Sequence, residues 1–157
     1  MIILSFFKKK LNKQDFVQLI YELGLEHFAF LKEQFENEIN INETLLYELS
    51  ITATSLLCKR IFYFKQIDLG YDVADEVDKL SNNNFVEVPL ELTTYYLTIK
   101  DELWEIMKNE NMEVLDLAKY FINEITQDNN TEEMLPQYMV NVLTDWHFQL
   151  KSILSNI

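Results

Sequence analysis

Only two glycines (Gly24, Gly70) and two prolines (Pro89, Pro136) occur in 157 residues. A sheet protein reverses direction often, and its tight turns usually need Gly or Pro. Their scarcity therefore favours a few long elements, and apolar residues recur every three or four positions, as on one face of a helix. We expect one all-α domain spanning residues 1–157, an antiparallel bundle of five or six helices, with residues 1–12 as a loosely attached apolar and basic segment.

Capping signals set the expected ends of the first two helices. Asn12 precedes a long apolar series and can cap a helix that fades near Asn37. Asn40 and Glu43 have the spacing of a capping box, which predicts the start of a second helix of about 25 residues. Gly70 lies where the C-terminal cap of that helix is expected.

The later helices are less sharply marked. A short helix is expected over residues 71–80. Residues 85–92 alternate apolar and polar side chains as a strand does, but Pro89 fits the first turn of the next helix better. Residues 108–113 predict a break between a fourth and a fifth helix, although one long bent helix has the same periodicity. The last helix is expected to begin near Pro136.

The charge of the chain limits what it can bind. The net charge is −13. Four of the thirteen basic residues lie within the first thirteen positions, which leaves nine to balance all 26 acidic residues. Such a body repels phosphate, so we expect no direct nucleic-acid binding, and it attracts basic partners. An acidic surface that only promotes solubility is the simpler interpretation.

The densest acidic stretch is "DLGYDVADEVD", which holds five carboxylates in eleven residues. On a helix these carboxylates fan over about 160°, opposite Val73 and Val77. A metal ion needs ligands that converge on one point, so we expect no metal site here. A solvated face is the main expectation, and an acidic patch that binds a partner is the alternative. The candidate partner-binding residues are Asp68, Asp72, Asp75, Glu76 and Asp78.

Few other residues could support catalysis. His27 and His147 lie at helical spacing from leucines, so both are expected in or near the core with a hydrogen-bond partner. Cys58, the single cysteine, lies in an apolar segment and is expected to be buried and inert. We predict no catalytic residues, no cofactor and no metal. Together with buried tyrosines, these three residues are the only candidates for the alternative, an enzyme or small-ligand binder with its site inside the bundle.

The N-terminal "MIILSFFKKK" places apolar residues before a lysine cluster. A secretory signal has the reverse order, and no apolar run approaches the roughly 18 residues of a membrane span. The segment can still contact an anionic membrane weakly. Packing on the bundle, with the lysines against its acidic surface, is the favoured alternative. The candidate membrane-contact residues are Phe6, Phe7, Lys8, Lys9 and Lys10.

These observations lead to a hypothesis about function. We expect a non-catalytic, cytoplasmic interaction protein that presents an acidic surface with aromatic residues to a basic macromolecule, for example as an immunity- or inhibitor-type protein. The alternatives are the enzyme or ligand binder and a peripheral membrane protein that uses its N-terminal segment. Homo-oligomer formation is also compatible with 21 aromatic residues and several apolar stripes. The residue usage resembles that of AT-rich bacteria or their phages.

Overall fold

The computed structural model describes residues 12–35, 41–83, 90–126 and 134–155. It is the all-α helical bundle that the sequence predicts, and its described part contains six helices and no strand. The helices are α2 (Lys13–Phe35), α3 (Glu43–Phe64), α4 (Val73–Asn83), α5 (Leu90–Met107), α6 (Val114–Thr126) and α7 (Met134–Ile153).

Helix α3 is the centre of the bundle and packs against each of the five other helices. Every residue from Ser50 to Cys58 is buried, so this helix has no solvent-facing side over more than two turns. Its sequence there mixes leucines with Ser, Thr and Ala, which suits a helix that is surrounded by neighbours. The other helices bury one stripe each against it.

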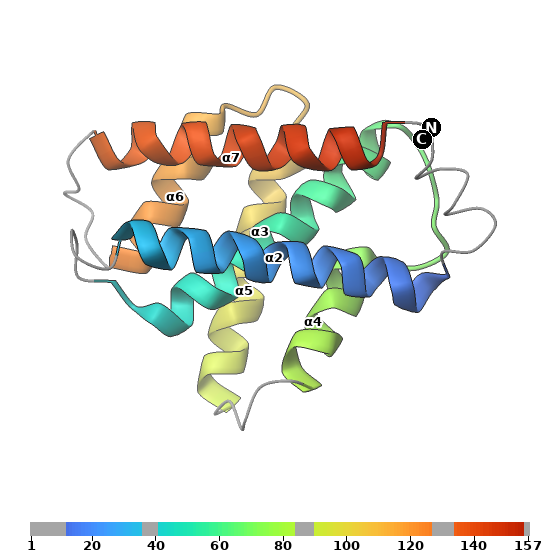
Figure 1. Cartoon of the computed structure of the whole chain (residues 1–157), viewed down its shortest axis with the longest axis horizontal. Helices are drawn as coiled ribbons and strands as arrows, with labels where there is room; N and C mark the ends of the chain where they lie inside the picture. Colours follow the sequence, from blue (N-terminus) through green and yellow to red (C-terminus); the bar gives the residue numbers. More distant parts are fainter. Residues whose placement is uncertain (1–11, 36–40, 84–89, 127–133, 156–157) are drawn as a thin grey trace.

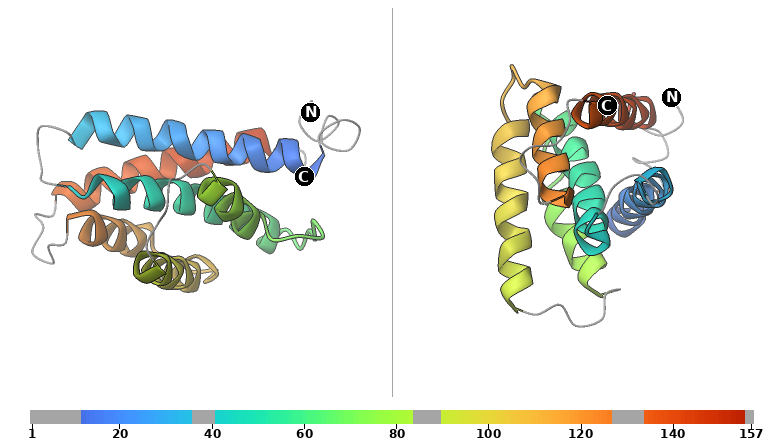
Figure 2. Two further views of the ribbon diagram at one scale, coloured as in Figure 1. Left: turned by 90° about the horizontal axis from the view of Figure 1, so that it is seen from below. Right: turned by 90° about the vertical axis from the view of Figure 1, so that its left-hand side faces the viewer.

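The helices lie in layers around α3 (Figures 1 and 2). Helices α2 and α7 run side by side in opposite directions along the long axis and cover one side of α3. Helix α5 lies on the other side, at the outer edge of the molecule, and crosses the direction of α2 and α7. The surfaces of α2 and α5 are therefore on opposite sides of the molecule.

The closest approach of two helices explains one of the rare glycines. A Cβ atom added at Gly24 of α2 would lie 3.0 Å from the Cα atom of Ile51 in α3. That contact is to backbone and cannot be relieved by turning a side chain. Gly24 therefore lets the backbones of α2 and α3 pack together.

The expected helix starts are confirmed at α2 and wrong at α3. Asn12 accepts a hydrogen bond from the amide of Asp15 at 2.8 Å, as expected of a cap. The cap of α3 is Asn42, whose side chain accepts from the amide of Leu45 at 3.1 Å. The predicted cap Asn40 lies outside the described residues. Two asparagines lie within three residues here, and the capping-box spacing pointed to the first of them.

Helix α3 also ends earlier than predicted. It stops at Phe64, with Lys65 as its C-cap. Gln66 then takes the left-handed conformation (φ 56°), although the sequence assigned the cap to Gly70. Gly70 does adopt a left-handed conformation (φ 80°), but within the loop of residues 65–72 that leads into α4. A residue other than glycine can hold this conformation at a cost of about 1–3 kcal/mol where the surrounding structure supports it. A prediction that looks only for glycine therefore misses such a helix end.

The remaining boundaries follow the expected order. The strand considered at residues 85–92 is not formed by its described part, because α5 begins at Leu90; Pro89 itself lies outside the described residues. Helices α5 and α6 are separate, so the prediction of a break over residues 108–113 is confirmed and the single bent helix is excluded. Pro136 lies in the first turn of α7, where its missing amide costs no hydrogen bond.

Candidate interaction surface

The acidic stretch spans the 65–72 loop and α4. Asp68 is exposed in the loop and accepts a hydrogen bond from the amide of Gly70 at 2.8 Å. Asp72 precedes α4 and accepts from the amide of Asp75 at 3.1 Å, which makes it the N-terminal cap of that helix. These two carboxylates therefore shape the backbone that carries the rest of the stretch.

Lysines from three other helices reach the carboxylates of α4. Lys100 of α5 is the most enclosed of them, with only 12% of its side chain exposed. The ion pairs are Lys59–Asp72 (2.8 Å), Lys13–Glu76 (3.0 Å), Lys79–Glu76 within α4 (3.4 Å), and Lys100 with both Asp75 and Asp78 (2.5 Å each). Four of the five carboxylates in the stretch are therefore compensated by cations within the chain.

The protonation of these groups reflects burial as much as charge. Burial raises the pKa of Asp78, and the hydrogen bond from Lys100 offsets only part of that rise. Burial also opposes ionisation of Asp72, but the hydrogen bonds from Lys59 and the Asp75 amide outweigh it and lower the pKa. Part of the predicted solvated face is thus a network between helices.

Glu48 of α3 lies beside this network. It lines a small hollow between α3, α4 and α5, together with Asp78, Tyr96 and Lys100. Burial, reinforced by the negative charge of Asp78, raises the pKa of Glu48 to about 7. The sequence does not mark Glu48 as a site residue, since one glutamate in an apolar stripe carries no sign of the acids that a neighbouring helix brings to it.

Exposed aromatic side chains mark the end of α3. Tyr63 is 54% exposed and Phe64 is 39% exposed. The Tyr63 ring packs edge-on against Trp104 of α5, with ring centres 5.5 Å apart. Arg60 donates from Nε to the carbonyl oxygen of Met107 at 2.7 Å and so ties the end of α5 to α3. We call Tyr63, Phe64 and Trp104 the Tyr63 surface.

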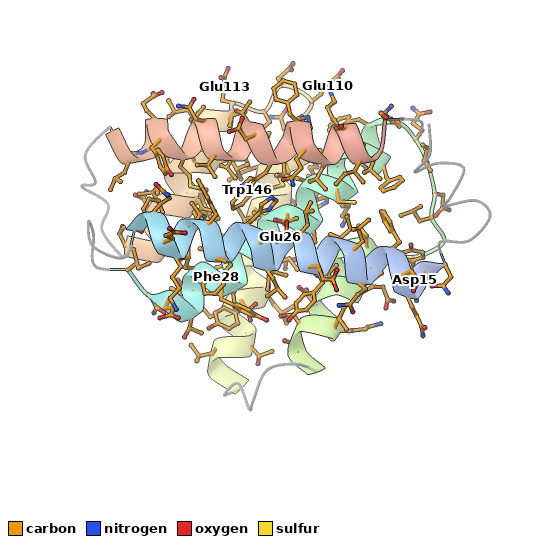
Figure 3. All side chains as sticks on the ribbon, viewed as in Figure 1. Asp15, Glu26, Phe28, Glu110, Glu113 and Trp146 are labelled. Carbon is orange, nitrogen blue, oxygen red and sulfur yellow. The ribbon has the colours of Figure 1, made fainter. Side chains whose placement is uncertain are left out.

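The α5–α6 hairpin carries acids of a different kind. Asp101, Glu110, Glu113 and Asp116 are exposed, and no side-chain ion pair or hydrogen bond reaches their carboxylates from the described residues. Figure 3 shows Glu110 and Glu113 at the edge of the molecule formed by the α5–α6 turn, far from Asp15. These four residues, named here the α5–α6 acids, lie on α5 with Trp104, in the turn that follows it and in the first turn of α6.

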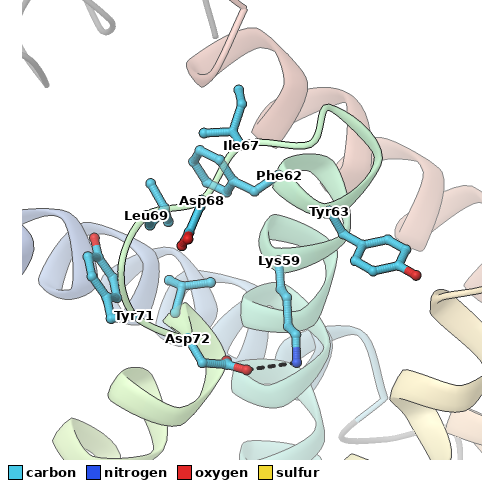
Figure 4. A pocket seen from close by; sticks show the side chains of 9 residues that line it. Lys59, Phe62, Tyr63, Ile67, Asp68, Leu69, Tyr71 and Asp72 are labelled. Atoms are coloured by element: carbon cyan, nitrogen blue, oxygen red, sulfur yellow. Dashed lines mark ion pairs between the residues drawn. The ribbon is translucent and has the colours of Figure 1, made fainter.

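A hollow of about 270 Å³ opens between the end of α3 and the 65–72 loop (Figure 4). Its walls are largely apolar and aromatic, and the Asp68 carboxylate points into it between Phe62 and the Lys59–Asp72 pair. The lining residues are Lys59, Phe62, Tyr63, Ile67, Asp68, Leu69, Tyr71, Asp72 and Val73. Tyr63 belongs to both the hollow and the Tyr63 surface, so the two features are continuous.

His27 is a core histidine with two partners, as predicted. Its Nδ1 and Nε2 atoms lie 2.8 Å from Thr54 Oγ1 and Gln149 Oε1, and its ring stacks on Trp146 at 4.1 Å. Burial lowers its pKa to about 4, so the ring is neutral at pH 7. The Thr54 hydroxyl donates to the Ser50 carbonyl and therefore accepts from Nδ1–H. Neutral Nε2 then needs a donor, which the Gln149 amide supplies when turned by 180°.

The other candidate catalytic groups do not join His27. His147 is half-buried, and within the described chain its side chain has no hydrogen bond, so the expected partner is missing. Cys58 is a buried free thiol whose pKa is raised by burial, as predicted for an inert cysteine. In the described part of the chain, no group of three or more His, Cys, Asp or Glu side chains could hold a metal ion.

The membrane prediction lies largely beyond what the structure describes. Phe6, Phe7, Lys8, Lys9 and Lys10 are outside the described residues. Among the described helices, none is long and apolar enough to cross a membrane.

The exposure of Tyr63 and Phe64 is not apparent from the sequence. Both residues belong to an apolar run, but they lie in the last turn of α3, where the surrounding helices no longer cover it.

No family model, curated protein or solved structure matches this chain.

Proposed function

We propose that this protein is a non-catalytic interaction protein that binds a basic macromolecular partner through the Tyr63 surface and the α5–α6 acids. The observation that carries the proposal is the exposure of Tyr63 and Phe64 beside carboxylates that no lysine or arginine of the described chain neutralises. Aromatic residues are enriched at protein interfaces, and a charged rim speeds the encounter with an oppositely charged partner.

The distribution of charge supports this side of the molecule over α4. The α4 carboxylates are engaged by Lys13, Lys59 and Lys100, so a basic partner would have to displace these cations. The α5–α6 acids need no such exchange. The free thiol of Cys58 and the net charge of −13 fit a cytoplasmic setting, which forms part of the proposal.

Affinity capture tests the proposal. The full chain is immobilised and exposed at low salt to a lysate of the cells that produce it, and retained proteins are eluted with rising salt. A basic protein that elutes early in the gradient is expected, since screening weakens exposed charge pairs. The purified partner is then titrated against the chain by fluorescence anisotropy.

Two charge-matched triple variants give the comparison its control. Asp101→Asn/Glu110→Gln/Glu113→Gln removes three α5–α6 acids, and it is expected to weaken the complex about tenfold. Glu26→Gln/Glu33→Gln/Asp145→Asn removes three exposed charges on α2 and α7 and is expected to have a much smaller effect. Equal losses would show that only net charge matters, and retention of no basic protein at low salt would refute the proposal.

A further inference from the structure

The hollow beside the Tyr63 surface has an uneven charge balance. Among the described residues that line it, Lys59 is the only cation, and that ammonium is held by Asp72 at 2.8 Å and lies 4.2 Å from the centre of the Trp104 ring. The Lys59 charge is thus already compensated. Asp68 is left as the uncompensated charge, because its Oδ1 atom accepts only the Gly70 amide and no lysine or arginine of the described chain pairs with it.

The walls of the hollow suit the stem and the flat head of an arginine. Phe62, Leu69 and Val73 provide an apolar lining, and the rings of Phe62 and Tyr71 lie on the Asp68 side of the hollow (Figure 4). The Tyr63 ring points away from Asp68, toward Trp104 of α5. A guanidinium group is planar, stacks on aromatic rings and binds a carboxylate through two parallel hydrogen bonds. An ammonium group is more strongly hydrated and offers no flat face.

The loop that forms the hollow is organised before any ligand arrives. The amide of Ile67 donates to the carbonyl of Phe62 at 3.0 Å, and the amide of Gln66 donates to that of Tyr63 at 3.2 Å. The two left-handed residues, Gln66 and Gly70, set the reversal of the chain. A preformed site loses less conformational entropy on binding.

We infer that this hollow receives an arginine side chain of the basic partner, with the guanidinium on the Asp68 carboxylate and the stem along Phe62 and Leu69. The inference deepens the proposed function and rests on it for the origin of the arginine. It also gives one of the predicted acidic residues a role that the other four do not share.

The test uses amino-acid amides as probes on the full chain. N-acetyl-arginine amide is titrated into isotope-labelled protein at low salt and followed by amide NMR shifts. Saturable shifts in the millimolar range are expected at Gly70, Asp72 and neighbouring amides. N-acetyl-citrulline amide has nearly the same shape without the charge and is expected to give no saturation. N-acetyl-lysine amide is expected to bind several-fold more weakly.

A matched pair of variants identifies the carboxylate. Asp68→Asn keeps a side-chain oxygen for the Gly70 amide and removes the charge, so at least a fivefold loss of arginine-amide affinity is expected. Asp145→Asn removes an exposed charge on α7, outside the proposed interaction surface, and is expected to leave the affinity unchanged. Three results would each overturn the inference: saturation by the citrulline probe, shifts that lie away from the hollow, and undiminished binding of the arginine amide to Asp68→Asn. The first two are measured on the unaltered protein.

The same reagents separate this inference from the proposed function. If the captured partner binds the Asp68→Asn protein as tightly as the unaltered protein, the hollow is not its arginine site, and the proposed function stands. If the arginine amide binds the hollow but no basic protein is retained, the proposed function fails, and the hollow keeps its selectivity for a guanidinium group.

Discussion

The acids of α4 and the α5–α6 acids have different surroundings in the folded chain. The α4 carboxylates meet Lys13, Lys59 and Lys100, which come from three different helices. The α5–α6 acids meet no cation among the described residues, although Lys108 and Lys119 are near them in sequence. The denser acidic stretch in the sequence is therefore the one better compensated in the structure.

This difference shows that the density of acidic residues in a sequence does not predict how much unpaired charge the folded surface carries. Desolvation opposes an ion pair between helices, and the attraction between the charges exceeds it only when the geometry is good, so the fold must position the lysines. Lys100 illustrates this, because it lies 22 residues or more from both of its partners. The first prediction removes it.

Lys100→Met is expected to lower the free energy of unfolding by about 3 kcal/mol, the typical loss when one partner of a largely enclosed ion pair is removed. Asp78 would be left half-buried without its cation, next to Glu48. Urea denaturation at pH 7 measures the change. Lys108→Met is the control, since Lys108 pairs with an exposed glutamate and its loss should not alter the midpoint measurably. If the urea midpoint of Lys100→Met equals that of the unaltered chain, as is expected for Lys108→Met, the α4 network adds nothing to stability.

The second prediction concerns Glu48 and pH. Its pKa is raised from 4.5 to about 7, so it stabilises the fold fully below pH 4.5, and this contribution is lost as the pH rises through 7. Allowing for partial exposure, Glu48→Gln is expected to be about 2 kcal/mol more stable than the unaltered chain at pH 8 and no more stable at pH 4. Urea titrations at both pH values test this.

His27 provides an internal check on that experiment. Its pKa is lowered from 6.5 to about 4, so its contribution is present above pH 6.5 and is lost as the pH falls toward 4. Between pH 4.5 and 6.5 the effects of His27 and Glu48 oppose each other. The stability of Glu48→Gln should therefore rise with pH across this range, whereas the unaltered chain stays nearly level. Parallel profiles for both proteins would show that Glu48 has an ordinary pKa.

Local sequence determined much of the fold and little of this surface. Asn12 as a cap, the break before Val114 and the buried His27 follow from short-range chemistry and apolar spacing, and the structure confirms them. The end of α3 and the partners of α4 depend on which helices pack together. No pattern around Tyr63 or Lys100 encodes that information, so the exposed aromatic pair and the ion-pair network could not be predicted.

The third prediction compares two acids at the starts of helices. Asp72 caps α4 and also pairs with Lys59, so Asp72→Ala is expected to cost about 1.5 kcal/mol. Asp116 lies in the first turn of α6 and interacts mainly with the helix dipole, so Asp116→Ala is expected to cost about 0.5 kcal/mol. Chemical denaturation of both variants tests the order. A reversed order would mean that the cap and the Lys59 pair of Asp72 together stabilise the fold less than the dipole interaction of Asp116 does.

The smallest effect is expected where the α5–α6 acids are neutralised without a partner present. The triple variant Asp101→Asn/Glu110→Gln/Glu113→Gln should unfold within about 0.5 kcal/mol of the unaltered chain, and slightly later at low salt, because repulsion between exposed like charges is relieved. Thermal melts at low and high salt measure this, with Glu26→Gln/Glu33→Gln/Asp145→Asn as the control. If the triple variant unfolds with almost the same free energy as the unaltered chain but binds the partner more weakly, these charges act in recognition and not in stability. A loss of stability comparable to that of Lys100→Met would instead mean that the α5–α6 hairpin depends on ion pairs as α4 does, and the contrast between the two regions would no longer hold.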